Sequence, residues 1–131
     1  MLSISTSNLI TIKNNQILLV KRNPDGNEGG LWSLPGGTRE NAEIPEETLK
    51  REIKEELNSE LKNIIFLKDY LWPDSEKTVH AYYFQADLMH DIKLDTRELS
   101  DYQWFDIPKI PQTLAYHQNQ IINELIIKYK K

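Results

Sequence analysis

Segment 45–57 constrains this chain more than any other, because its residues predict a helix with definite ends. Pro45 suits the first turn of a helix, where its missing N–H costs nothing. Glu46 and Glu47 then lie at the positive end of the helix dipole. Asn58 readily adopts the left-handed conformation that ends many helices. We therefore predict a helix over residues 45–57.

This predicted helix gathers like charges. At about 100° per residue, Glu52, Glu55 and Glu56 fall on one stripe, which borders the apolar face rather than open solvent. Like charges at these spacings destabilise a helix by about 0.2–0.5 kcal/mol per pair. A solvated acidic face is the common explanation for a glutamate-rich helix. A divalent cation also removes the repulsion, and carboxylate oxygens suit Mg²⁺ or Mn²⁺, so the stripe is a candidate metal site.

The sequence around the helix resembles the box that marks the Nudix hydrolase family. Gly37 is followed after five residues by Glu43, and after seven more by the run 51–56, Arg-Glu-Ile-Lys-Glu-Glu. The likeness spans residues 9–105. Outside the box, the segments similar to the family's pattern are 18–22, 32–37 and 98–105.

The match departs from the family's pattern at the end of the box, which covers residues 37–59. Asn58 and Ser59 stand where the family has glycine and an aliphatic residue. Asparagine can make the same left-handed turn at modest cost. Leu61 is the candidate for the missing apolar anchor. Neither change removes a carboxylate.

The resemblance implies an α+β chain with the Nudix fold, an α/β/α sandwich around a mixed β-sheet, as a single domain over residues 1–131. Besides the helix 45–57, the residue patterns predict strands, a hairpin turn at 13–16 and a second helix at 117–129. Segments 23–30 and 35–37 read as loops. The predicted strands are 9–12, 17–20, 31–34, 63–72, 78–88 and 102–105.

The resemblance also implies roles for individual residues. Mg²⁺, or alternatively Mn²⁺, would be held by the three box glutamates, the Gly37 carbonyl and one acid from outside the box. For that acid Glu98 is the first choice and Asp101 the second. Glu43 and Arg51 would form a supporting ion pair. The implied catalytic residues, one of them the base, are Glu52, Glu55, Glu56 and Glu98.

Other side chains are candidates for substrate binding, each with an ordinary alternative. Arg22 and Arg39 could bind phosphate, or be exposed charges beside a loop. Trp32 and Trp72 could stack on a base, although most aromatic residues in strands are core. Asn119 could bind a base edge, or simply lie at a helix start. His80 is a distant second choice as a base.

The whole chain sets outer limits on function. Its 131 residues, 39% apolar and 27% charged, suit one globular domain. A net charge of −4 argues against duplex nucleic acid as a partner, and a small nucleotide is expected instead. The lack of cysteine, of a signal sequence and of a long apolar run predicts a cytoplasmic protein with no membrane contact. Monomer and homodimer both stay open.

Three functional hypotheses follow. The first is metal-dependent hydrolysis of a phosphoanhydride bond in a nucleoside triphosphate or another nucleoside diphosphate-X substrate, as in the MutT-like branch. The second is an ADP-ribose or nucleotide-sugar pyrophosphatase, suggested by Pro73, which lies about where such relatives carry a proline. The third is a Nudix module that binds nucleotides without catalysis. Such modules usually lose box carboxylates, whereas this chain keeps them.

Overall fold

A computed structural model describes residues 2–25, 29–73 and 76–126 of the chain. Strands dominate these described residues, which also contain two α-helices and two short 3₁₀ turns. In chain order the elements are β1 (Leu2–Ile10), β2 (Ile12–Lys13), β3 (Gln16–Arg22), β4 (Trp32–Ser33), β5 (Gly36–Thr38), α1 (Pro45–Leu57), β6 (Leu61–Pro73), β7 (Lys77–Leu88), β8 (Leu99–Asp106), η1 (Ile107–Lys109), η2 (Ala115–His117) and α2 (Gln118–Leu125).

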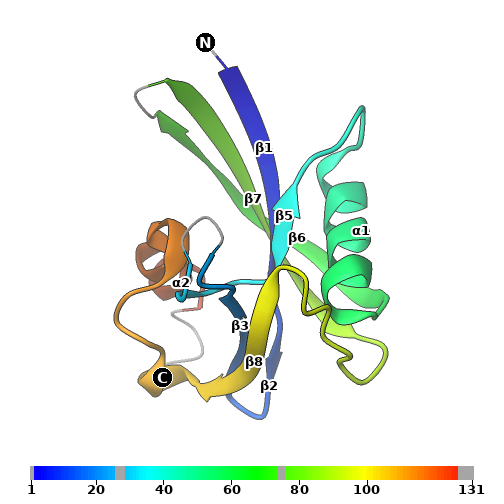
Figure 1. The fold of residues 1–131 in the computed structure, drawn as a ribbon, viewed down its shortest axis with the longest axis vertical. Coiled ribbons are helices and arrows are strands. Elements are labelled where there is room, and N and C mark those ends of the chain that lie inside the picture. The colour runs from blue at the N-terminus through cyan, green and yellow to red at the C-terminus, as the bar shows by residue number, and fades with distance from the viewer. Residues whose placement is uncertain (1, 26–28, 74–75, 127–131) are drawn as a thin grey trace.

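The strands form two sheets. The first has the order β5-β1-β7-β6 and is mixed, because β1 and β7 are parallel while the other neighbours are antiparallel. In the second, β3 pairs with β8 along one edge and with β2 and β4 along the other, all antiparallel. Figure 1 shows α1 and α2 on opposite sides of these strands, which confirms the predicted sandwich.

The core has two halves, one under each helix. On β3, Ile17 and Leu19 pack in the half that contains the apolar residues of α2. Leu18 and Val20 point the other way and pack with those of α1. All four side chains are fully buried, and the burial of each stabilises the folded state by about 1.5–3 kcal/mol. A strand covered on both faces reads as a continuous apolar run, which is the pattern of this segment.

Helix α1 has the predicted bounds. Glu47 accepts a hydrogen bond from the Ile44 amide at 2.9 Å, which satisfies one free donor of the first turn. Asn58 ends the helix at φ 58° and ψ 40°, the predicted left-handed conformation. Buried Ser59 accepts hydrogen bonds through Oγ from two amides of the 89–90 turn. Leu61 packs against the α1 half of the core and so supplies the anchor.

Several boundaries differ from the sequence prediction. β1 begins at Leu2 rather than residue 9, and Gly36–Thr38 forms β5 where a loop was predicted. β8 also extends beyond 102–105 at both ends. The 13–16 hairpin is confirmed, because Asn14 and Asn15 both have positive φ at its tip. The predicted second helix is α2, preceded by η2, and the part of the prediction at 127–129 lies outside the described residues.

Candidate active site

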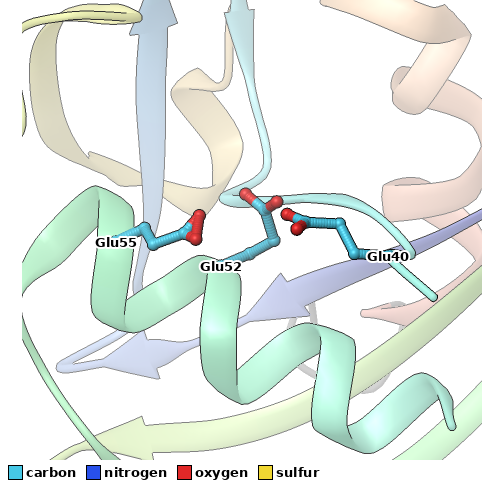
Figure 2. A group of neighbouring side chains, drawn as sticks. All are labelled: Glu40, Glu52 and Glu55. Atoms are coloured by element: carbon cyan, nitrogen blue, oxygen red, sulfur yellow. The ribbon is translucent and has the colours of Figure 1, made fainter. Parts of the chain in front are cut away.

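Three carboxylates meet at the edge of the first sheet. Glu52 and Glu55 project from α1 and Glu40 from the segment after β5, with their carboxylates turned toward one another (Figure 2). One oxygen from each lies within 4.8 Å of the others. Oxygen donors at this separation suit a hard divalent cation.

Arg51 lies among these carboxylates. Its Nη1 atom is 2.8 Å from a carboxylate oxygen of Glu40, 2.8 Å from one of Glu52 and 3.1 Å from one of Glu55. Its other two nitrogens donate to Glu43 at 2.7 and 3.1 Å. The hydrogen bonds from Arg51 lower the pKa of Glu43 to about 2. One guanidinium therefore faces four carboxylates and leaves an excess of negative charge, which a divalent cation would balance.

A cavity of about 500 Å³ adjoins this cluster. Its wall includes three of the predicted acids, Glu52, Glu56 and Glu98, and both candidate phosphate ligands, Arg22 and Arg39. Glu52 belongs to the carboxylate cluster as well as to the cavity wall, so it joins the two. Glu55 lies in the cluster only.

Glu56 is the most enclosed of these acids, with 5% of its surface exposed. Burial, assisted by nearby Glu52 and Glu98, raises its pKa to about 8 against the opposing effects of the Gly36 amide and Arg22. The Gly36 N–H donates to a Glu56 carboxylate oxygen at 3.0 Å. Burial also raises the pKa of Glu52. Ionisation of either acid therefore costs free energy, and a bound cation would offset that cost.

The glycine pair of β5 allows this close packing. Gly36 has φ +142°, and a Cβ there would lie 2.1 Å from the Ser7 carbonyl oxygen. A Cβ on Gly37 would instead lie 2.3–2.7 Å from the carboxyl atoms of Glu52. Gly36 is therefore required by the backbone, whereas Gly37 gives room to an acidic side chain of the site.

Four other candidate site residues differ in whether they line the cavity. Trp72 lines the cavity. Trp32 does not, and its ring packs edge-on against Phe105 with centroids 5.0 Å apart. Asp101 accepts a hydrogen bond from the Tyr102 amide outside the cavity. His80 pairs with Asp69 on the sheet face opposite to that of the cavity-lining Val79 and Ala81, since neighbouring residues of a strand alternate.

The base-binding interpretation of Asn119 is corrected by its contacts. Its Oδ1 accepts from the Leu114 amide and its Nδ2 donates to the Pro111 carbonyl, both at 2.8 Å. The side chain therefore ties down the turn before α2 and does not line the cavity. The neighbouring residue Gln118 does line it, with its Oε1 held by the Leu34 amide at 2.8 Å.

The residues of the site that were absent from the sequence prediction include Glu40, Tyr116 and Gln118. Glu40 lies in the segment between β5 and α1, and no spacing rule connects it to the helix. Tyr116 and Gln118 reach the cavity from the turn before α2. The sequence does indicate this region, because the start of the second helix is a candidate site, but the prediction names Asn119 instead of Gln118.

Comparison with protein families matches the NUDIX domain over residues 1–125. The chain is 34% identical over 98 residues to the NAD-capped RNA hydrolase NudC of Pectobacterium atrosepticum, which is 74% of this chain and 36% of that protein. It is 30% identical over 104 residues to the NAD-capped RNA hydrolase NudC of Vibrio atlanticus, which is 79% of this chain and 38% of that protein. The chain thus spans less than two fifths of the length of these relatives.

Solved structures of Nudix proteins share the fold of this chain. The MutT NUDIX hydrolase of Burkholderia pseudomallei superposes with a TM-score of 0.86 at 25% identity, over 96% of this chain and 99% of that one. The MutT protein of Methanosarcina mazei Go1 shares the fold with a TM-score of 0.82 at 24% identity, over 99% and 97%. The chain belongs to the NUDIX domain family.

Within the described residues, no helix combines the length and the apolar character needed to cross a bilayer.

Proposed function

We propose that the chain is a Mg²⁺-dependent pyrophosphohydrolase of nucleoside triphosphates or other nucleoside diphosphate-X compounds. The observation that carries this proposal is the position of Glu52, which belongs both to the three-carboxylate cluster and to the wall of the cavity that holds Arg22. The candidate metal ligands and the candidate phosphate ligands would thereby act at one place. The names of the NudC and MutT relatives support the same activity.

The side chains divide into separate roles in this proposal. Glu52, Glu55 and Glu40 would hold the cation, together with Glu56, Glu98 and the Gly37 carbonyl on the cavity side. When bound, the cation neutralises phosphate oxygens and lowers the pKa of a coordinated water. Arg22 and Arg39 bind phosphate oxygens by charge-assisted hydrogen bonds. Glu56 or Glu98 accepts the proton of the attacking water. The Glu43–Arg51 pair orients Glu52 and Glu55.

A substrate with two large groups is the second candidate, and the extent of the cavity favours it. Ile4, Val79 and Trp72 lie opposite one another across β1, β7 and β6, and all three line the cavity. With strands about 4.8 Å apart, the wall from β5 to β6 spans roughly 14 Å. ADP-ribose, a nucleotide sugar or an NAD-like end would use both ends of this wall. The relatives named NAD-capped RNA hydrolase agree with this possibility.

A substrate panel tests the proposal. Purified protein with Mg²⁺ is expected to cleave at least one of the deoxynucleoside triphosphates, ADP-ribose, NAD or UDP-glucose, with products identified by chromatography. EDTA should abolish the reaction and excess Mg²⁺ should restore it. Nucleotide binding that needs no Mg²⁺ and leads to no turnover would instead identify a binding module.

The two glycines of β5 provide a matched pair of variants. Gly36→Ala is expected to destabilise the fold by about 1–3 kcal/mol, because its Cβ meets backbone and its φ favours glycine. Gly37→Ala is expected to keep the melting temperature but to lower turnover roughly 10- to 100-fold, because its Cβ displaces the Glu52 carboxylate. Thermal melts and steady-state kinetics measure both. Equal effects of the two variants on turnover per folded molecule would contradict the placement of Glu52.

A further inference from the structure

We propose that Tyr116 is a positioning residue for Arg22, holding its guanidinium at the cavity wall so that it can bind phosphate. This inference rests on the proposed function. It assigns a role to a residue outside the Nudix box, in the turn before α2. Tyr116 acts through Arg22 rather than on the reacting atoms.

The contact itself is direct. The Cζ atom of Arg22 lies 5.5 Å from the ring centroid of Tyr116, within the range of a cation–π interaction. Both residues line the cavity. The Nε atom of Arg22 is buried and has no hydrogen-bond partner among the described residues. Arg22 lies near enough to Glu56 to lower the pKa of that acid, but it forms no salt bridge with a described carboxylate, and the ring of Tyr116 is a direct contact that can orient its guanidinium.

An aromatic ring suits this position better than a carboxylate would. Glu52, Glu56 and Glu98 line the same cavity and attract the guanidinium. If Arg22 formed a full ion pair with one of them, its N–H donors would be occupied by that carboxylate and would not be available to a phosphate. A neutral ring holds the guanidinium by its face and leaves the N–H donors at the edge available to a phosphate.

The backbone of Tyr116 is held in an unfavourable conformation. Its φ is 57° and its ψ 27°, in the left-handed region that a bulky side chain seldom adopts. Such a conformation persists only where the surroundings impose it, and it often marks a functional position. In this chain the conformation occurs at the residue whose ring contacts Arg22.

Contacts on both sides of Tyr116 impose that conformation. Asn119 closes the turn by binding the Leu114 amide and the Pro111 carbonyl. Gln118 binds the Leu34 amide, and Leu114 forms a parallel bridge with Trp32. The turn is thus fixed to the β4 region, close to the end of β3 that carries Arg22. The role of Asn119 is to support this arrangement.

The test compares Tyr116→Phe with Tyr116→Leu. The leucine variant is expected to raise KM for the best substrate of the panel about two- to fivefold with kcat little changed, as befits an exposed cation–π contact. Its affinity for ADP, measured by calorimetry without metal, should fall by a similar factor. The phenylalanine variant keeps the ring and should match the wild type in both measurements. Unchanged KM and ADP affinity in Tyr116→Leu would overturn the inference.

Two further comparisons separate positioning from a general effect on folding. In an Arg22→Gln background, Tyr116→Leu should cause no additional loss of ADP affinity; additive losses would show that Tyr116 does not act through Arg22. Tyr116→Gly should melt at a higher temperature than Tyr116→Ala, because only glycine relieves the positive φ. Equal melting temperatures would overturn the strain argument. Absence of turnover by the wild type would refute the proposed function. The ADP titrations would still test whether Tyr116 positions Arg22, because they do not depend on turnover.

Discussion

Glu52→Gln is expected to lower kcat by about 100-fold or more at saturating Mg²⁺, equivalent to ~2.7 kcal/mol of transition-state stabilisation. Glu52 is the acid shared by the carboxylate cluster and the cavity. Glutamine keeps the shape of the side chain but removes the charge that attracts a cation. Steady-state kinetics on the best substrate of the panel, over a range of Mg²⁺ concentrations, measure the effect.

Glu46→Gln is the matched control for this substitution. Glu46 lies on the same helix, pairs with Lys50 at 3.2 Å and does not line the cavity. It should retain turnover within about twofold of the wild type, since surface ion pairs contribute little. Glu52→Gln should also melt no lower than the wild type, because it removes a partly buried charge. Near-wild-type turnover of Glu52→Gln at every Mg²⁺ concentration would exclude Glu52 as a metal ligand.

The central helix was predictable because local physics determines it. Pro45, the acidic first turn and Asn58 give start and stop signals that do not depend on the rest of the fold. The apolar period of 45–57 then fixes which face is buried. The stripe of glutamates follows from the same geometry, so the acids of the box could be placed before the fold was known.

β1 was missed over residues 2–8 because the reason for that strand is distant in sequence. This segment is rich in serine and threonine, and its apolar alternation is limited to Leu2 and Ile4, too short to predict a strand. Its order comes from parallel pairing with β7, more than 70 positions away, and from the Ser7 hydroxyl, which donates to the Pro45 carbonyl at 2.7 Å. Neither contact has a local signature.

The site shows the same division between local and distant causes. Glu40 and Tyr116 come from turns whose positions are set by tertiary contacts, and no sequence spacing places them beside Glu52 or Arg22. Asn119 was chosen for a substrate role that its position near the helix start suggested. At the start of a helix, a shift of one position changes which side chain faces the cavity. Gln118, not Asn119, is the residue that faces it.

The stability of the metal-free protein is expected to fall as pH rises from about 4.5 to about 8, because burial raises the pKa of Glu56 from 4.5 to about 8. A carboxyl group with a raised pKa in the folded state stabilises that state below its unfolded pKa. The contribution is lost as pH rises through the folded pKa. For a group this buried the loss is on the order of a few kcal/mol. Melting temperatures recorded across this range without metal measure it.

A bound divalent cation reverses this dependence, and the reversal gives the sharper result. Mg²⁺ favours the ionised carboxylate, so it should raise the melting temperature more near pH 8 than near pH 6, where it competes with the proton on Glu56. Glu56→Gln has no such proton, so its metal-free melting temperature should vary less with pH, and any remaining Mg²⁺ effect should be nearly equal at both values. If the wild type gained the same stability from Mg²⁺ at both values, the cation would bind where it does not affect Glu56. The buried acid of α1 would then belong to the fold alone, and the metal site would be confined to the outer cluster of Glu40, Glu52 and Glu55.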